Sequence, residues 1–390
     1  MGTRLSLNRA IFNLAAGLWH VRFYGQTHRK KQPSRVSLGS ILSILLSHSK
    51  NRDVLGGCGH FLPTDRHIIT IGKCRWIGKK FLSSEWMPGV ITHKNDTYLC
   101  TAYALNTEDT NFLVGFDPIA HMHGVHHVLL FGCDGPGSDE LVWNCGEMTR
   151  HRGDTEEEES RAPTCTEQPN ILYAWAHDAP KLDLPEGVAF RVGGNTKNKY
   201  LVLQVHYMHE TKKEDFSGVR VASTPLPQPK TAATLLVVTG GEIAPKSTEQ
   251  LEAACVVDES VEMHPFAFRV HTHRHGKRVG GWVVKENPTT GVDQWTLLGS
   301  RDPQLPQLFE GVKNKSIVVS QGDIIAARCD IKNEENRKIQ IGPTGEDEMC
   351  NFYLMYWVDG DDVLTNNVCF SPGSPQYHWS SQAGLNHLPH

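Results

Sequence analysis

Residues 267–275 read A-F-R-V-H-T-H-R-H, in which the residues at alternate positions differ in character, as in a β-strand with two different faces. Side chains of a β-strand point alternately to two faces. One face would be apolar and suited to a packed core: Phe266, Phe268 and Val270. The other would carry a guanidinium and two imidazoles: Arg269, His271 and His273. Two imidazoles at i and i+2 form a two-nitrogen metal clamp, but a solvated face with incidental histidines explains this stretch equally well.

Length and charge limit the kinds of protein that this chain can be. The 390 residues are enough for two or three domains. Lys and Arg number 39 and Asp and Glu 43, so the net charge of −4 indicates no polyanionic partner such as nucleic acid. No apolar run approaches membrane-spanning length. We expect a globular, β-rich protein without a transmembrane segment.

The cysteines indicate an oxidising compartment. There are 10 of them, scattered and without a C-x-x-C pair, which favours disulfides over a zinc ribbon or a redox motif. The glycosylation sequons at Asn95 and Asn314 agree with secretion. Residues 1–85 show no clear signal peptide, and we expect them to be an atypical extension or leader.

Short strands with turn signals between them predict β-sandwiches rather than βαβ units. The expected strands are residues 96–105, 112–116, 126–133, 171–176, 188–192, 201–207, 234–238, 267–275, 282–286, 295–298, 317–320, 323–328 and 349–358. The proline-rich residues 225–229 cannot continue a sheet and form the expected linker. This organisation predicts domains at 86–224 and 230–375, followed by a tail at 376–390.

Two further places carry histidines within apolar, strand-like sequence. His126 and His127 are adjacent, so on an ideal strand they face opposite sides and bind one ion together only at a bend or a strand start. The alternative is one buried, hydrogen-bonded histidine and one exposed one. His206 lies beside Gln204 in an apolar strand, where a lone histidine is usually structural.

A third segment adds a thioether. Met349, Asn351 and Tyr353 share one face of the strand expected there. Methionine often only fills gaps in a core. If Met349 joins His271 and His273, however, two imidazoles and a thioether favour copper, because zinc has no reason to recruit methionine and iron oxygenases also need a carboxylate.

Four motifs occur in a recognisable order. They are H-H-V-L-L-F-G-C at 126–133, L-Q-V-H-Y at 203–207, R-V-H-T-H at 269–273 and D-E-M-C-N at 347–351. Together they closely resemble the peptidylglycine α-hydroxylating monooxygenase family, the copper enzymes of peptide amidation. Further similar stretches are residues 175–176, 184–194 and 303–307, and the resemblance runs from about residue 88 to residue 369.

The resemblance implies two copper ions per chain, each in its own domain. The ligands of the electron-transfer copper would be His126, His127 and His206. Those of the oxygen-binding copper would be His271, His273 and Met349. The terminal carboxylate of the peptide would be held by Arg269, Asn351 and Tyr353. A guanidinium with amide and phenol donors suits that task.

The family also implies a fold and a reaction. The fold is all-β, with two jelly-roll-like sandwiches separated by a solvent-filled cleft. The reaction is hydroxylation of the α-carbon of the C-terminal glycine in glycine-extended peptides, with O2 as co-substrate and ascorbate as reductant. It is the first step of peptide amidation in neuropeptide processing. The expected location is the secretory pathway, as a monomer in the granule lumen or secreted.

Disulfide pairing follows from the same resemblance. The implied pairs are Cys100–Cys145, Cys133–Cys165, Cys255–Cys369 and Cys329–Cys350. Phe216 occupies one half of a fifth family bridge, which leaves Cys58 and Cys74 without an implied partner.

Two other functions are compatible with parts of this pattern. A two-copper amine hydroxylase of the dopamine β-monooxygenase type shares the metal core, but the Arg-Asn-Tyr set favours a peptide acid over an amine. A non-catalytic, copper-binding extracellular module needs only the sandwiches and leaves the complete ligand set unexplained. Because the sequence ends at His390, we expect a monofunctional hydroxylase without a fused lyase domain, which requires a separate amidating lyase downstream.

Overall fold

The described chain consists of strands and loops. The computed structural model describes residues 75–77, 80–120, 124–146, 161–176 and 178–390, so Cys58 and Cys74 lie outside it. No helix occurs within those ranges, which confirms the all-β prediction. The same residues therefore include no helix long and apolar enough to cross a bilayer.

A sheet of five strands forms one layer of the N-terminal half, in the order β6-β3-β10-β5-β7. The strands are β3 (Thr97–Ala104), β5 (His127–Cys133), β6 (Trp143–Asn144), β7 (Asn170–Ala176) and β10 (Tyr200–Tyr207). β10 is the central strand and pairs antiparallel with β3 and β5. It is buried from Leu201 to Tyr207, so Gln204 and His206 are polar groups inside an apolar layer.

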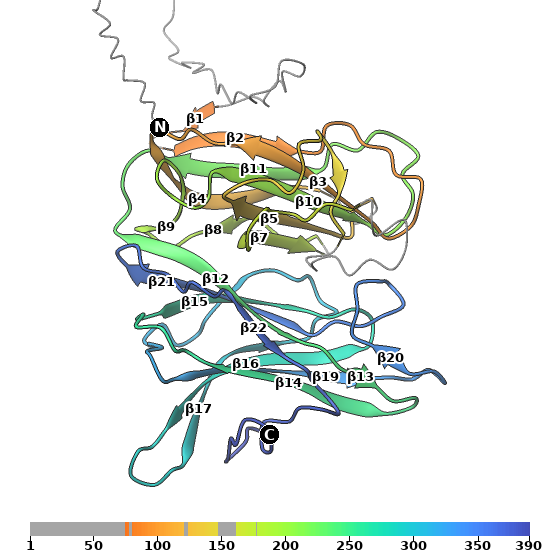
Figure 1. The fold of residues 1–390 in the computed structure, drawn as a ribbon, viewed down its shortest axis with the longest axis vertical. Helices are drawn as coiled ribbons and strands as arrows, with labels where there is room; N and C mark the ends of the chain where they lie inside the picture. Colours follow the sequence, from red (N-terminus) through yellow and green to blue (C-terminus); the bar gives the residue numbers. More distant parts are fainter. Residues whose placement is uncertain (1–74, 78–79, 121–123, 147–160, 177) are drawn as a thin grey trace, which may run out of the picture. The chain divides into compact units, whose positions relative to one another are not determined.

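A second sheet, of eleven strands, runs through both halves of the described chain (Figure 1). Its main path is β1-β2-β11-β4-β9-β12-β21-β15-β18, with β8 beside β4 and β22 beside β12. The strands of its N-terminal part are β1 (Arg75–Ile77), β2 (Lys80–Trp86), β4 (Thr110–Ile119), β8 (Leu182–Asp183), β9 (Val188–Gly193) and β11 (Gly218–Thr224). Because β2 pairs with β11, the sheet begins before residue 86, within the segment expected to be an extension.

The other strands of this long sheet belong to the C-terminal half. They are β12 (Lys230–Thr239), β15 (His264–His271), β18 (Glu310–Gly311), β21 (Asn351–Asp359) and β22 (Val368–Ser371). β12 follows the proline-rich residues 225–229 and pairs antiparallel with β21, while only its first residues pair with β9. The two halves of the sheet are therefore joined by a short parallel contact.

A four-stranded sheet covers the C-terminal part of the long sheet (Figure 1). Its strands, in the order β14-β19-β16-β17, are β14 (Thr248–Val256), β19 (Ile324–Lys332), β16 (Gly276–Glu286) and β17 (Asp293–Arg301). Two short strands, β13 (Glu242–Ile243) and β20 (Ile339–Gln340), form a separate two-stranded sheet. The strand predicted at 317–320 is wrong: Val319 forms only an isolated bridge with Met263, and the Ser320 N–H donates to Asp323 instead of a neighbouring strand.

The C-terminal part of the long sheet is buried on both faces. Leu235 and Val237 of β12 pack in the C-terminal core, whereas Leu236 between them packs in the N-terminal core. In β15, Phe268 and Val270 face the C-terminal core, as their alternation predicts. Phe266 instead packs against the N-terminal core, because the register shifts between Pro265 and Ala267.

The pairing of β15 with β21 sets the arrangement of the candidate site. Arg269 is opposite Tyr353, and His271 is opposite Asn351. β15 ends at His271, earlier than the predicted strand, so His273 lies in the loop that follows.

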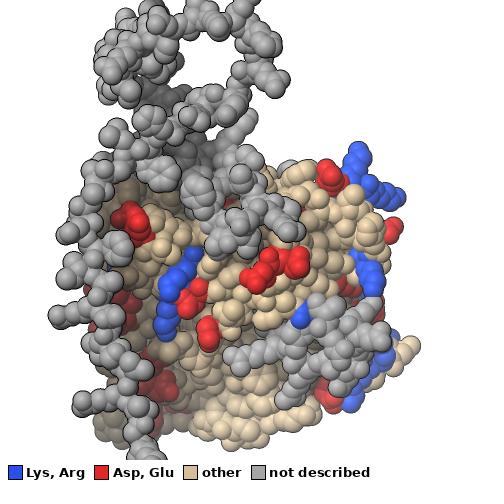
Figure 2. Space-filling view, turned by 45° about the horizontal axis from the view of Figure 1, so that its top comes forward, with Lys and Arg blue, Asp and Glu red and all other residues tan. Residues whose placement is uncertain are grey.

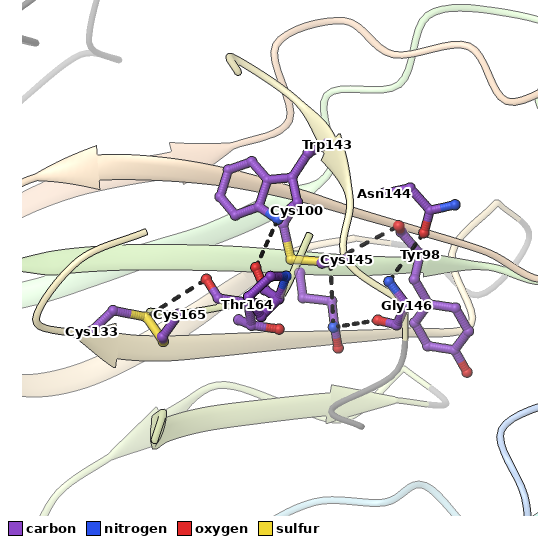
Figure 3. Close-up of a disulfide and its surroundings, with 11 residues drawn as sticks. Tyr98, Cys100, Cys133, Trp143, Asn144, Cys145, Gly146, Thr164 and Cys165 are labelled. Carbon is purple, nitrogen blue, oxygen red and sulfur yellow. Dashed lines mark hydrogen bonds between the residues drawn. A yellow bond between two sulfur atoms is a disulfide. The ribbon is translucent and has the colours of Figure 1, made fainter. Parts of the chain in front are cut away.

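Four disulfides join distant segments, and they are the pairs that the resemblance implies. They are Cys100–Cys145, Cys133–Cys165, Cys255–Cys369 and Cys329–Cys350. Figure 3 shows the first two disulfides. Beside them, the Trp143 indole N–H donates a hydrogen bond to the carbonyl of Pro163, the residue before Thr164, at 3.0 Å. Nearby, the buried Gln204 amide donates to the Gly146 carbonyl at 2.9 Å. Disulfides form in oxidising compartments, so these four support a protein of the secretory pathway.

Charged side chains of both signs are interspersed on the described surface in Figure 2. This matches the near balance of 39 basic and 43 acidic residues in the sequence.

Candidate metal centres

The first candidate centre lies where β5 begins beside β10. His127 is the first residue of β5 and is opposite His206 of β10. His126 precedes the strand in a bend, so its side chain is not bound by strand alternation. One ligand atom from each of these histidines lies within 4.8 Å of the other two. The bend therefore resolves the geometric difficulty of two adjacent histidines at one site.

Hydrogen bonds show which ring nitrogens of this centre are available. His206 Nε2 lies 3.2 Å from Asp96 Oδ1, and a carboxylate accepts the ring proton there. The lone pair of His206 is then on Nδ1, which lies 3.2 Å from His126 Nδ1. Within the described chain, the buried Nδ1 of His127 has no hydrogen-bond partner. Buried polar atoms are nearly always satisfied, so a buried ring nitrogen without a partner, beside two other imidazoles, fits a metal ligand.

Burial favours the neutral form of two imidazoles of this centre, His127 and His206. It lowers the pKa of His127 well below its ordinary value, and the neighbouring His206 and His126 lower it further. Burial also lowers the pKa of His206, although Asp96 opposes this effect. The Tyr98 ring stacks on His206 with centroids 4.0 Å apart. Neutral imidazole is the form that binds metals.

The second candidate centre lies at the end of β15 and the start of β21. The ring centroids of His271 and His273 are 5.4 Å apart. His271 Nδ1 lies 2.7 Å from Gln307 Oε1, and His273 Nδ1 lies 3.0 Å from the Asp347 carbonyl oxygen. Both partners are acceptors, so each Nδ1 carries the proton and each Nε2 keeps its lone pair for a metal.

Met349 is the candidate for a soft ligand atom at the second centre. It is buried and lines a small cavity together with His271 and Asn351. The Asn351 amide nitrogen lies 3.8 Å from the Met349 sulfur. Two imidazole nitrogens and a thioether fit copper. His275 is not part of this centre, because its ring accepts from Arg274 at 3.0 Å.

A buried guanidinium lies beside the second centre. Arg269 is 2 % exposed, and burial lowers its pKa. Its Nε donates to the Gln307 carbonyl at 2.9 Å, and its Nη2 to Gln307 Oε1 at 3.1 Å. It also lies over the Tyr353 ring, 5.0 Å from the centroid. None of the ion pairs among the described residues involves Arg269. This buried cation can therefore bind a carboxylate from outside the protein.

The two candidate centres lie next to each other. The ring centroids of His127 and His271 are 6.1 Å apart, and those of His126 and His273 are 6.4 Å apart. The Tyr98 hydroxyl also donates across the same junction to the Pro343 carbonyl at 3.0 Å. The two sandwiches are therefore in contact at this point.

Three residues that support the two centres are not indicated by any pattern in the sequence. Asp96 orients His206, Gln307 contacts both Arg269 and His271, and Glu348 accepts backbone N–H bonds around the second centre. Gln307 and Glu348 lay in stretches that resemble the family, but a single sequence indicates no contact partner for either. Carboxylate and amide partners of this kind typically fix the orientation of metal-binding histidines.

Comparisons with known proteins agree with this geometry. Residues 86–214 match the N-terminal domain model of the copper type II ascorbate-dependent monooxygenases, and residues 230–382 match the C-terminal one. The chain is 39% identical over 297 residues to peptidyl-glycine alpha-amidating monooxygenase A of Xenopus laevis, covering 74% of this chain and 29% of that protein. It is 40% identical over 295 residues to the Rattus norvegicus peptidylglycine alpha-amidating monooxygenase, covering 74% and 28%.

A more distant relative matches a similar share of the chain. Human dopamine beta-hydroxylase is 25% identical over 287 residues, covering 68% of this chain and 44% of that protein. The chain thus spans less than a third of the length of the amidating relatives that it matches. The matched domains and the identity to these relatives show that the chain belongs to the copper type II ascorbate-dependent monooxygenase family.

Proposed function

We propose that this protein hydroxylates the α-carbon of the C-terminal glycine in glycine-extended peptides, using copper, ascorbate and O2. The observation that carries the proposal is Arg269, a buried cation with no carboxylate partner among the described residues, beside the second candidate copper centre. A buried charge without a counter-ion is costly. A substrate carboxylate would remove that cost, and a C-terminal glycine provides one.

Two copper ions would be held by the two centres. The first would be bound by His126, His127 and His206, and the second by His271, His273 and Met349. When bound, copper supplies one-electron redox chemistry and activation of O2, which side chains alone cannot provide. The protein contributes ligands of fixed orientation: Asp96, Gln307 and the Asp347 carbonyl hold the rings of His206, His271 and His273 in place.

Arg269, Asn351 and Tyr353 would orient the substrate. All three line the cavity that His271 and Met349 also line; its volume is about 10 Å³, room for about one water molecule, so it would have to widen around a bound carboxylate. A carboxylate bound by the guanidinium and the neighbouring amide and phenol places the adjacent glycine α-carbon close to the ligands of the second centre. Orientation of this kind accounts for hydroxylation at the α-carbon rather than elsewhere along a flexible peptide.

A neighbouring groove could hold the rest of the peptide. It has a volume of about 880 Å³, and Met349 and Asn351 form part of its wall. Its other lining residues include the apolar Leu236, Val238 and Ile341. This volume is ample for the residues before the terminal glycine, and its apolar wall favours apolar side chains there.

The overall reaction balances with two electrons. The substrate, O2, two electrons and two protons give the α-hydroxyglycine peptide and water. The hydroxylated carbon also bears the peptide nitrogen, so a lyase reaction can split the C–N bond to give the peptide amide and glyoxylate. Within the secretory pathway, we propose the secretory granule lumen as the site of action. Both centres are built from one chain, so a monomer is sufficient for activity.

The test uses purified full-length protein and a glycine-extended peptide. We expect two copper ions per chain, ascorbate consumption that depends on the peptide, and hydroxyglycine product by mass spectrometry. Arg269→Gln should raise KM for the peptide acid strongly and leave copper content unchanged. The same peptide with its terminal carboxylate amidated is the matched control and should not react. Absence of product with both copper ions bound would exclude the hydroxylase.

The relative named dopamine beta-hydroxylase makes an amine hydroxylase the second candidate. A phenethylamine presents a cation, and the buried Arg269 guanidinium would repel it. Product from the amine but not from the peptide would favour this candidate. Copper binding without either product would favour a non-catalytic module.

A further inference from the structure

A polar cavity lies beside the two candidate centres, on a wall that the peptide site does not share. Its volume is about 470 Å³, within the range of about 300–1,000 Å³ typical of small-molecule sites. Its lining includes histidines from both centres: His126, His206 and His273. Neither Met349 nor Arg269 is among its lining residues, whereas both line the small substrate cavity. A small molecule bound in this polar cavity would therefore reach both centres without displacing a peptide.

We propose that the polar cavity is the docking site of ascorbate. The inference rests on the proposed function, because it requires copper at both centres. The family is ascorbate-dependent. An electron can enter a metal centre through the exposed edge of a liganding imidazole. Imidazole edges of both centres meet in this one cavity.

The charges around the cavity suit an anion once copper is bound. Asp96 and Glu346 are acidic, but Asp96 is engaged by His206 at 3.2 Å and Glu346 by Arg337 at 2.9 Å. Arg274 adds a cation whose side chain is half exposed and lies 2.8 Å from Glu335. Bound metal ions are usually the largest charges in a site. Cupric ions on two sides would make the cavity attractive to the ascorbate monoanion.

The electron balance is simple. Each ascorbate monoanion gives one electron to a cupric ion and one proton to solvent, leaving an ascorbyl radical anion and a cuprous ion. Two ascorbate molecules in succession reduce the two centres. Two ascorbyl radicals and a proton then disproportionate to ascorbate and dehydroascorbate. No reactant beyond the proposed function is required.

Met208 provides a test by size. It lies two residues after His206, is half-buried and lines the cavity. Met208→Trp should fill much of the space, and Leu297→Trp is the control because Leu297 is 47% exposed on β17 and lines none of the three cavities described. The experiment measures the anaerobic reduction of the copper-loaded protein by ascorbate, without peptide. The readout is the loss of the cupric electron paramagnetic resonance signal.

We expect the wild-type rate to saturate with ascorbate concentration. Met208→Trp should lower the second-order rate constant about tenfold, with the copper content, the cupric spectrum and reduction by dithionite unchanged. Leu297→Trp should behave as the wild type.

Glu346 provides an independent test by charge, since its side chain is 74% exposed and it belongs to neither centre. Glu346→Gln should speed reduction by ascorbate about twofold at low ionic strength, and added salt should remove the gain. A neutral aromatic diamine reductant should show no gain. Glu334→Gln, at an exposed carboxylate outside the cavity, is the control with the same change in net charge.

The outcomes separate this inference from the proposed function. Copper-loaded variants that are all reduced by ascorbate at the wild-type rate would overturn the docking site and leave the hydroxylase intact. A protein that binds no copper would overturn the proposed function, and the docking site with it.

Discussion

A single buried carboxylate links two of the residues proposed to hold the second copper. Glu348 is fully buried and accepts hydrogen bonds from three backbone N–H groups. Those of Met349 and His275 are 2.8 Å long, and the third comes from His273. Both proposed ligands, His273 and Met349, are therefore tied to the same side chain.

Glu348→Gln should weaken copper binding at the second centre alone. The amide nitrogen cannot accept from an N–H group, so at least one of the three bonds is lost. We expect the copper affinity of this centre to fall by about 10–100-fold, with the centre at His126 unchanged. Chelator competition monitored by the cupric spectrum would measure this. The control is Glu286→Gln on an exposed end of β16, and equal affinities in both variants would contradict the role of Glu348.

Met349→Ile should abolish turnover while leaving the fold. Isoleucine retains an apolar side chain of similar size but offers no lone pair. The stoichiometry should fall toward one copper per chain, and the circular dichroism spectrum should stay that of the wild type. Val358→Ile on β21, in the C-terminal core, is the control. Normal turnover by Met349→Ile would exclude Met349 as a ligand.

At the residue level, the sequence predicts the candidate metal ligands better than it predicts the residues that hold those ligands in place. Imidazole and thioether are informative by themselves, so His271, His273 and Met349 could be proposed from chemistry and strand alternation. Gln307 could not, because a glutamine has many ordinary roles and its partner His271 is 36 residues away. The orphaned nitrogen of His127 is likewise a property of the packed structure alone.

At the level of the elements, β21 is the strand on which both cores depend. Phe352 is fully buried in the C-terminal core, with its ring stacked on Phe268 at 5.7 Å, while the adjacent Tyr353 packs in the N-terminal core. Phe352→Ala should lower the free energy of unfolding by about 3–5 kcal/mol, because it removes apolar contacts and leaves a cavity. Denaturant titration would measure this.

Leu297→Ala is the control for that experiment. Leu297 lies on β17 and is 47% exposed, so its truncation should change the free energy of unfolding by no more than about 0.5 kcal/mol. A comparable loss of unfolding free energy in both variants would contradict the claim that the cores depend on β21.

Strand alternation was predictable, but strand ends and interruptions were not. The period-2 pattern correctly placed Phe268 and Val270 in one core. It misplaced Phe266, because a register shift precedes Ala267, and it extended the strand beyond His271. Both departures depend on pairing with β21, which lies about 80 residues further along the chain and has no signature in the local sequence.

At the level of the whole molecule, stability should depend on pH through a buried acid in the N-terminal sheet. Glu85 of β2 is 1% exposed, and its Oε2 atom has no hydrogen-bond partner among the described residues. Burial raises the pKa of Glu85 from 4.5 to about 7, although a hydrogen bond with Ser83 opposes the shift. The folded protein therefore binds this proton more tightly than the unfolded chain does.

The sign of the effect follows from linkage. The contribution of Glu85 to the free energy of unfolding is greatest below pH 4.5 and falls as the pH rises to about 7, because over this range the unfolded chain releases the proton more readily than the folded protein does. The shift corresponds to about 3 kcal/mol. Glu85→Gln keeps the shape without the titration, so its stability relative to the wild type should rise by about this amount between pH 5 and pH 8. Denaturant titrations at both pH values would measure it, with the exposed Glu334→Gln as control. A wild-type-to-Glu85→Gln difference that does not change with pH would show that the pKa of Glu85 is the same in the folded and unfolded protein, and acidification would then bring no stabilisation of the N-terminal sandwich from this residue.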